Sequence, residues 1–199
     1  MAPPVEGPSL IRPEIAWQPV FSHRVEILEL PRRMLAEEDV QNALKASESQ
    51  RERYEKLLAE VQKTPPEKRK GRWYHDLSRA YPASRSGPAV ARRFQTQQRE
   101  PNLPIEVHAL RLGDVGFVTN PFELYLDYGI RIKARSPALQ TFVVQLAGPG
   151  SYLPAARSIV GGAYGSLPRN TEVGVEGGEK LVEWSVAVLK ELWLTPGTQ

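Results

Sequence analysis

The chain has 199 residues, of which 41% are hydrophobic and 25% charged, so it is long enough to bury the core of one ordinary globular domain. It contains no cysteine, which excludes disulfides and thiolate metal sites. The net charge of +3 is too small to indicate a class of partner. No apolar run is long enough for a transmembrane segment, and the first residues, MAPPVEGPSLIRPE, do not resemble a secretory signal. The compartment is left unknown.

The first third of the chain predicts an extended lead-in, a strand and a long helix. Residues 1–22 are rich in proline and predict an extended lead-in rather than a folded element. Residues 23–30 (HRVEILEL) predict a strand. Residues 36–63 predict a helix, because acidic residues occupy the first turn and an apolar stripe follows at helical spacing. That stripe is narrow, which indicates a helix that packs on the outside of something larger.

Residues 64–104 have the least readable pattern, and they predict at most one short helix followed by irregular chain. Basic and aromatic residues alternate through 63–99, as they do on some nucleic-acid-binding surfaces. Acidic residues dilute that patch, however, and no RNA-binding motif accompanies it. A solvated loop is the better interpretation, so no nucleic-acid partner is predicted. Residues 105–112 (IEVHALRL) then predict a half-buried strand that leads into the tight-turn pair Gly113-Asp114.

A strand–helix–strand unit follows. Apolar runs at 115–119 and 140–146 predict two strands. The helix between them is expected over about 123–135, with Asn120-Pro121 as its start. Two strands joined by a helix of this length are most simply parallel.

The last helix is predicted over 178–193, where apolar residues recur at helical spacing, and it should lie on the sheet. The predicted fold class is therefore α/β, with a mixed sheet, a parallel strand–helix–strand unit and flanking helices. Residues 23–195 would form a single domain or the C-terminal half of a larger catalytic domain.

Glu123 allows two interpretations. It lies three residues after Asn120, so its carboxylate could accept a hydrogen bond from the Asn120 amide in a capping box, which is the commoner arrangement. Alternatively, the carboxylate is aimed at a ligand above the carboxyl ends of the parallel strands, where the ligand sites of such sheets lie. Tyr152 and Tyr164 occupy a glycine-rich loop. Such tyrosines are more often packed than reactive, because a phenol with a pKa of about 10 is a poor ligand unless a cation lies close.

Other familiar site motifs are absent from the sequence. It has no phosphate-binding loop, dinucleotide fingerprint, HExxH motif or nucleophile elbow. His23, His75 and His108 lie far apart in the sequence and form no metal-spaced pair. The two histidines in predicted strands, His23 and His108, are expected to face solvent.

Several segments between about Leu103 and Trp193 are similar to the C-terminal part of the catalytic domain of neutral or alkaline, non-lysosomal ceramidases. The segments are LRLGDVGFVTNPFE, YGIRIKARSP, FVVQLAGPGSYLP, GGAYG and GGEKLVEWSVAVLKEL, with a weaker match in HRVEILELPRR. The similarity is good over a little under half of the chain. Enzymes of this family are zinc amidohydrolases that cleave the N-acyl bond of ceramide, and they hold zinc with two histidines, a glutamate and a tyrosine.

The resemblance implies roles for three residues. Glu123 and Tyr152 would correspond to the glutamate and tyrosine that bind zinc, and Tyr164 to the catalytic tyrosine that polarises the scissile carbonyl. The chain departs from the family pattern at Phe122, where glycine is usual, and at Gly165, where glutamate commonly follows the second tyrosine. Ala155 likewise stands where threonine is usual.

The family's two zinc histidines and its serine lie upstream, in a half of the domain that has no counterpart here. A catalytic zinc site needs about three protein ligands plus water, and the resemblance supplies only two. The chain is therefore predicted to be a C-terminal fragment or truncated relative of a ceramidase-like hydrolase, inactive alone. Zinc, and a ceramide-like N-acyl lipid as substrate, would require the missing half. Possible partners are that half or a second copy, and the alternative is a non-catalytic interaction or structural protein.

Overall fold

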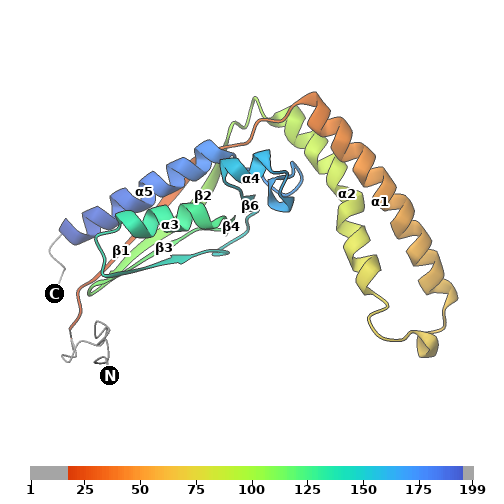
Figure 1. Cartoon of the computed structure of the whole chain (residues 1–199), viewed down its shortest axis with the longest axis horizontal. Helices are drawn as coiled ribbons and strands as arrows, with labels where there is room; N and C mark the ends of the chain where they lie inside the picture. The colour runs from red at the N-terminus through yellow and green to blue at the C-terminus, as the bar shows by residue number, and fades with distance from the viewer. Residues whose placement is uncertain (1–17, 195–199) are drawn as a thin grey trace, which may run out of the picture.

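A computed structural model describes residues 18–194 of the chain as an α/β fold with a mixed sheet (Figure 1). Most of the predicted lead-in, residues 1–17, lies outside the described residues. The elements in chain order are β1 (Phe21–Pro31), α1 (Glu37–Lys63), η1 (Pro66–Lys68), α2 (His75–Thr96), β2 (Asn102–Leu112), β3 (Val115–Thr119), β4 (Glu123–Leu124), α3 (Leu126–Arg135), β5 (Gln140–Val144), β6 (Tyr152–Leu153), α4 (Ala156–Val160), η2 (Tyr164–Ser166) and α5 (Val175–Leu194).

The main sheet has the strand order β1-β2-β3-β5. β1 and β2 pair antiparallel over eleven residues each, and β2 and β3 form a hairpin whose turn contains Gly113 at a φ of 59°. A positive φ of this size favours glycine. β3 and β5 are parallel and are joined through α3. The four strands predicted from the apolar patterns, and the parallel pairing predicted from the helix that joins the last two, are therefore confirmed.

One face of the sheet is buried under α3 and α5, which lie side by side across it (Figure 1). Ile105, Val107 and Ala109 alternate along β2 and are almost fully buried. Two bidentate ion pairs join α3 to α5 at the surface, Arg131 with Glu179 and Arg135 with Glu183. The burial of apolar surface between the sheet and the two helices stabilises folding by roughly 25 cal/mol per Å². The helix predicted over 178–193 lies on the sheet as expected, beginning three residues earlier.

The other face of the sheet is apolar and exposed within the described part of the chain. Six of its large hydrophobic side chains are between 41% and 57% exposed: Phe21, Val25, Ile27, Leu112, Phe142 and Val144. They occupy the strand positions that alternate with the buried ones. The rings of Phe117 and Phe142 stack on this face with centroids 5.1 Å apart. His23, His108 and Glu106 lie among them on the same face. Exposed apolar side chains of this number on one face favour association with another surface.

A long helical hairpin, α1 with α2, is inserted between β1 and β2 and extends away from the sheet (Figure 1). The prediction for residues 64–104 was wrong, because α2 runs through 22 of them. Pro82 and Pro88 lie inside this helix, where proline normally breaks or kinks it. The expectation that α1 packs on the outside of a larger body was also wrong, since its principal partner is α2.

Contacts from α1 explain how α2 continues through Pro88. Proline has no N–H, so the Ser84 carbonyl, four residues earlier, loses its helical donor. The Ser47 hydroxyl of α1 lies 2.7 Å from the Ser84 oxygen and 3.2 Å from the Ala83 oxygen, and it accepts from the Gly87 amide. A Cβ on Gly87 would lie 2.8 Å from the Ala43 oxygen. A small residue there lets the two helices approach closely.

The base of the hairpin is fixed to the sheet region by side-chain-to-backbone hydrogen bonds. The Gln97 carboxamide accepts from the Leu35 amide at 2.8 Å and donates to the Leu35 carbonyl at 3.1 Å. Arg93 donates to the Pro168 carbonyl at 2.7 Å, while its buried Nη2 has no acceptor among the described residues. Burial lowers the pKa of the Arg93 guanidinium. These contacts place one face of α2 against the segment that follows η2.

We expect Ser47→Ala to lower the free energy of unfolding by about 1–2 kcal/mol, because the Ser84 carbonyl is then left without a donor. Urea unfolding followed by circular dichroism measures the loss. Ser49→Ala, on an exposed position of the same helix, is the matched control and should change stability little. Equal stability of the two variants would contradict the role assigned to Ser47.

Candidate functional site

The candidate site lies where the chain leaves β3 and β5. Two short strands, β4 and β6, pair in parallel there, and Glu123 lies directly opposite Tyr152. The bend after β3 is built by Asn120, whose side-chain oxygen accepts from the Phe122 amide at 3.1 Å. A Cβ on Gly150 would overlap the Pro121 carbonyl, so glycine permits the second chain to pass close to this bend. The pairing thus depends on local turn chemistry as well as on the sheet.

The capping-box interpretation of Glu123 is wrong. The Asn120 amide donates to the Val144 carbonyl at 2.9 Å instead of to Glu123. The helix predicted from about 123 begins at Leu126, with Tyr125 as its N-cap. Glu123 is an exposed residue of β4. Parallel pairing with β6 takes the place of the helical turn, since the Glu123 amide donates to the Ser151 carbonyl at 3.0 Å.

The side chains of Glu123 and Tyr152 interact. A hydrogen bond to the Glu123 carboxylate raises the pKa of the Tyr152 phenol, and desolvation and the negative charge of Glu123 act in the same direction. The phenol is protonated at neutral pH even at its ordinary pKa of about 10, and the neighbouring carboxylate stabilises this protonated form further. Two oxygen-bearing side chains from neighbouring strands therefore lie next to one another.

Tyr164 lies beside this pair, on η2. Its ring meets that of Tyr152 edge to face, with centroids 5.8 Å apart and an interplanar angle of 88°, and it is 64% exposed. Gly165 makes the contact possible, because a Cβ there would lie 2.7 Å from the Tyr152 ring and 2.8 Å from the Tyr125 hydroxyl. Glu123, Tyr152 and Tyr164, chosen from the sequence, are thus brought together at one end of the strands.

The structure also brings two histidines together that the sequence spacing kept apart. His23 of β1 and His108 of β2 stack with ring centroids 5.2 Å apart and nitrogen atoms 3.0 Å apart. The second nitrogen of His108 lies 3.1 Å from Glu106. The antiparallel register, which places His23 opposite Leu110, was the missing information. Within residues 18–194 no cluster of three or more histidine, aspartate or glutamate side chains is arranged to hold a metal.

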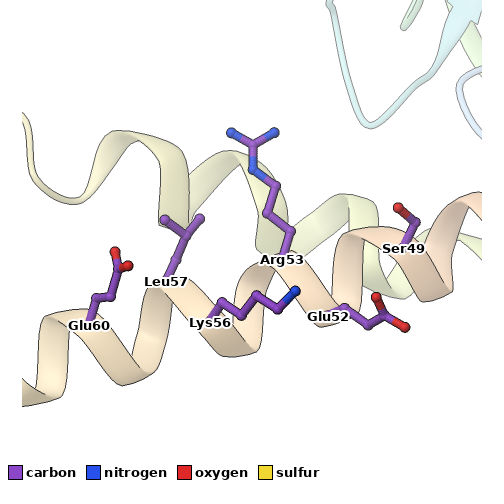
Figure 2. A pocket seen from close by; sticks show the side chains of 6 residues that line it. All are labelled: Ser49, Glu52, Arg53, Lys56, Leu57 and Glu60. Carbon is purple, nitrogen blue, oxygen red and sulfur yellow. The ribbon is translucent and has the colours of Figure 1, made fainter.

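A shallow hollow of about 320 Å³ lies on α1 and is unrelated to this site. Its lining, drawn in Figure 2, comes entirely from one helix and mixes both signs of charge: Ser49, Glu52, Arg53, Lys56, Leu57 and Glu60. Figure 2 also shows Arg53 extending away from the α1 ribbon. No pair of groups in this lining is arranged for catalysis, so we assign the hollow no role.

Comparisons with known protein families, with curated protein sequences and with solved structures find no match for this chain. No helix in the part of the chain that the structure describes is long and apolar enough to cross a bilayer.

The Glu123–Tyr152 contact predicts a specific pH dependence. In Glu123→Gln the carboxylate is gone, so we expect the pKa of Tyr152 to fall back toward the ordinary tyrosine value of about 10. A raised pKa in the folded chain contributes stability that is present below about pH 10 and is lost as the pH rises through the folded value. This alkaline loss of stability should therefore be smaller in the variant. Tyrosine ring carbon shifts in NMR, assigned with Tyr152→Phe, report the titration.

Glu100→Gln, which removes a carboxylate outside the site, is the control and should leave the Tyr152 titration unchanged. An identical Tyr152 titration midpoint in the native chain and in Glu123→Gln would show that the two side chains do not share a proton.

Proposed function

We propose that this chain is a C-terminal fragment or truncated relative of a zinc-dependent, ceramidase-like amidohydrolase. It would carry half of the zinc site and be inactive alone. The observation that carries the proposal is the position of Glu123 opposite Tyr152 on parallel strands, with Tyr164 against Tyr152. These are the three residues to which the resemblance assigns chemistry, and they come from segments up to 41 positions apart.

The donor set fits zinc in kind but not in number. Carboxylate oxygen is an ordinary zinc ligand, and a phenol becomes a good one when a cation replaces its proton. A cation held by both side chains would take the place of the Tyr152 phenol proton, which the interaction with Glu123 stabilises. Two protein ligands leave the coordination sphere too open for tight binding. The remaining ligands would come from an upstream half.

Each residue then has a distinct role in hydrolysis of an N-acyl amide such as that of a ceramide-like lipid. Glu123 and Tyr152 would hold the metal, which when bound supplies an activated water and polarises the carbonyl. Tyr164, whose exposed phenol lies next to Tyr152, would donate a hydrogen bond to the carbonyl oxygen. Donors aimed at developing negative charge are among the strongest contributors to catalysis.

A second candidate function is a non-catalytic interaction protein. The exposed apolar face of the sheet favours it, because that face is suited to cover by another chain whether or not chemistry takes place. Both candidate functions predict that the chain associates with another chain. Only the amidohydrolase function predicts zinc binding and amidase activity.

We expect the 199-residue chain alone neither to retain zinc nor to release fatty acid from a labelled ceramide. Supplying a ceramidase-like upstream half, by fusion or by co-expression, should restore both. In that complex Glu123→Ala and Tyr152→Phe should each weaken zinc binding at least tenfold, and Tyr164→Phe should slow turnover on the order of 100-fold. Mass spectrometry measures the metal content, and fatty-acid release measures the activity.

Tyr74→Phe, on the exposed surface of the hairpin, is the matched control and should alter neither quantity. Stoichiometric zinc with amidase activity from the chain by itself would show that the ligands have been misassigned. A complex without zinc would favour the interaction protein.

The exposed sheet face predicts association of the chain on its own. β1 and β5 are edge strands of the described sheet, and unpaired edges beside an apolar face invite pairing with another chain. We expect the purified chain to bind a hydrophobic dye and to self-associate, and the double variant Val25→Thr, Ile27→Thr to reduce both effects. Leu194→Thr, at a more exposed apolar position at the end of α5, is the control. A monomer that does not bind the dye would contradict this expectation.

A further inference from the structure

A basic groove lies next to the candidate site. It has a volume of about 880 Å³ and separates the α1–α2 hairpin from the segment that follows η2. Arg53 of α1 and Arg79 of α2 line one side, and Arg169 lines the other together with Tyr164 and Asn170. None of the residues that line it is acidic. Three segments distant in the sequence therefore contribute one arginine each to the lining of the same groove.

These three cations are poorly neutralised by the protein. Arg53 lies 3.5 Å from Asp76, a long ion pair in which both side chains are more than half exposed. Among the described residues Arg79 and Arg169 have no carboxylate partner within ion-pair distance. Like charges that converge in a concavity raise the local potential and attract anions. Guanidinium groups also match the geometry of phosphate and carboxylate oxygens.

The groove and the candidate site share residues. Tyr164 lines the groove and packs against Tyr152, and the Arg169 guanidinium lies 5.9 Å from the centre of the Tyr164 ring. Asn170 accepts from the Tyr152 amide at 2.9 Å and donates to the Tyr164 carbonyl at 2.7 Å. A molecule held at Tyr152 and Tyr164 would therefore lie next to the groove.

We infer that this groove binds the phosphate of an N-acyl amide substrate whose amide group is held at Glu123, Tyr152 and Tyr164. The inference rests on the proposed amidohydrolase function for the position of the amide. The substrate class is then a phosphorylated N-acyl amine rather than a neutral ceramide. Arg79 and Arg169 bind the phosphate oxygens from the two sides of the groove, and Arg53 adds positive charge from α1.

The test uses the 199-residue chain and needs neither zinc nor the upstream half. Calorimetric titration compares N-hexanoyl-phosphoethanolamine with N-hexanoylethanolamine, which differ only in the phosphate. We expect the phosphorylated amide to bind at least tenfold more tightly, and the difference to shrink as salt is added, because exposed charges are screened. Inorganic phosphate forms the third arm, and it should bind more weakly than the phosphorylated amide.

Matched variants locate the binding. Arg79→Gln and Arg169→Gln should each weaken binding of the phosphorylated amide roughly tenfold, as expected for loss of a charged hydrogen-bond partner. Arg92→Gln removes the same charge from an exposed position of α2 that does not line the groove, and it should leave affinity unchanged. Circular dichroism of each variant verifies that the helices are intact.

Several results would overturn the inference. Equal affinity for the phosphorylated and neutral amides would show that the groove does not bind the phosphate. An equal loss of affinity in Arg79→Gln, Arg169→Gln and the control Arg92→Gln would show that binding is non-specific. If inorganic phosphate bound as tightly as the phosphorylated amide, the amide group would make no contribution to binding. Saturable binding of a single-stranded oligonucleotide, without binding of the phosphorylated amide, would identify the groove as a nucleic-acid surface.

The failure of this inference can be told from failure of the proposed function. If the chain gains zinc and ceramide hydrolysis with its upstream half but shows no preference for the phosphorylated amide, only the role assigned to the groove is wrong. If the chain binds the phosphorylated amide selectively but never gains zinc with its upstream half, the groove remains a phosphate site. Its ligand would then no longer be assigned as the substrate of an amidohydrolase.

Discussion

One-sided burial of the four-stranded sheet is the constraint on which the rest of the structure depends. The strands place alternate residues under α3 and α5, and the core contains some of the largest fully buried side chains, including Leu30, Val107 and Leu189. Because side chains alternate along a strand, the remaining residues must point to the opposite face. That face holds Val25, Ile27 and Phe142, which no described element covers. The same alternation thus builds a stable core and an exposed face rich in apolar side chains.

The candidate site follows from this arrangement. Parallel pairing of β3 with β5 brings the carboxyl ends of both strands to one edge, and the chain pairs again just beyond, at β4 and β6. Tyr128 of α3 holds the β4–β6 pair in place, since its buried hydroxyl donates to the Pro154 carbonyl at 2.9 Å, just after β6. A Cβ on Gly178 of α5 would overlap that ring. Packing of both covering helices therefore fixes where Glu123 and Tyr152 meet.

Local patterns predicted the elements whose stability is local or set by burial. Alternation identified β1, β2, β3 and β5, and helical spacing identified α1 and α5. The prolines of α2 led sequence reasoning to irregular chain, because the compensating donor, Ser47, lies on another helix. Asn120-Pro121 has the composition of a helix start, yet the neighbouring strand provides partners for the following residues. The contact between His23 and His108 depends on strand register. The basic groove depends on the tertiary arrangement of the hairpin and the segment that follows η2. Neither feature has a signal in the linear sequence.

The electrostatics of the Glu123–Tyr152 pair are compatible with a folded chain that binds no cation. Two ionised oxygens on neighbouring strands would repel one another without a cation. At neutral pH the Tyr152 phenol is protonated, and the neighbouring carboxylate raises its pKa further, so the pair carries a single negative charge. The basic groove beside Tyr164 has the opposite imbalance, since Arg53, Arg79 and Arg169 line it and, within residues 18–194, only Arg53 has a carboxylate within ion-pair distance. One end of the strands therefore carries a negative charge, while the adjoining groove carries positive charge. The proposed substrate would suit this arrangement, because its phosphate would enter the positive groove while its neutral amide lies beside the carboxylate.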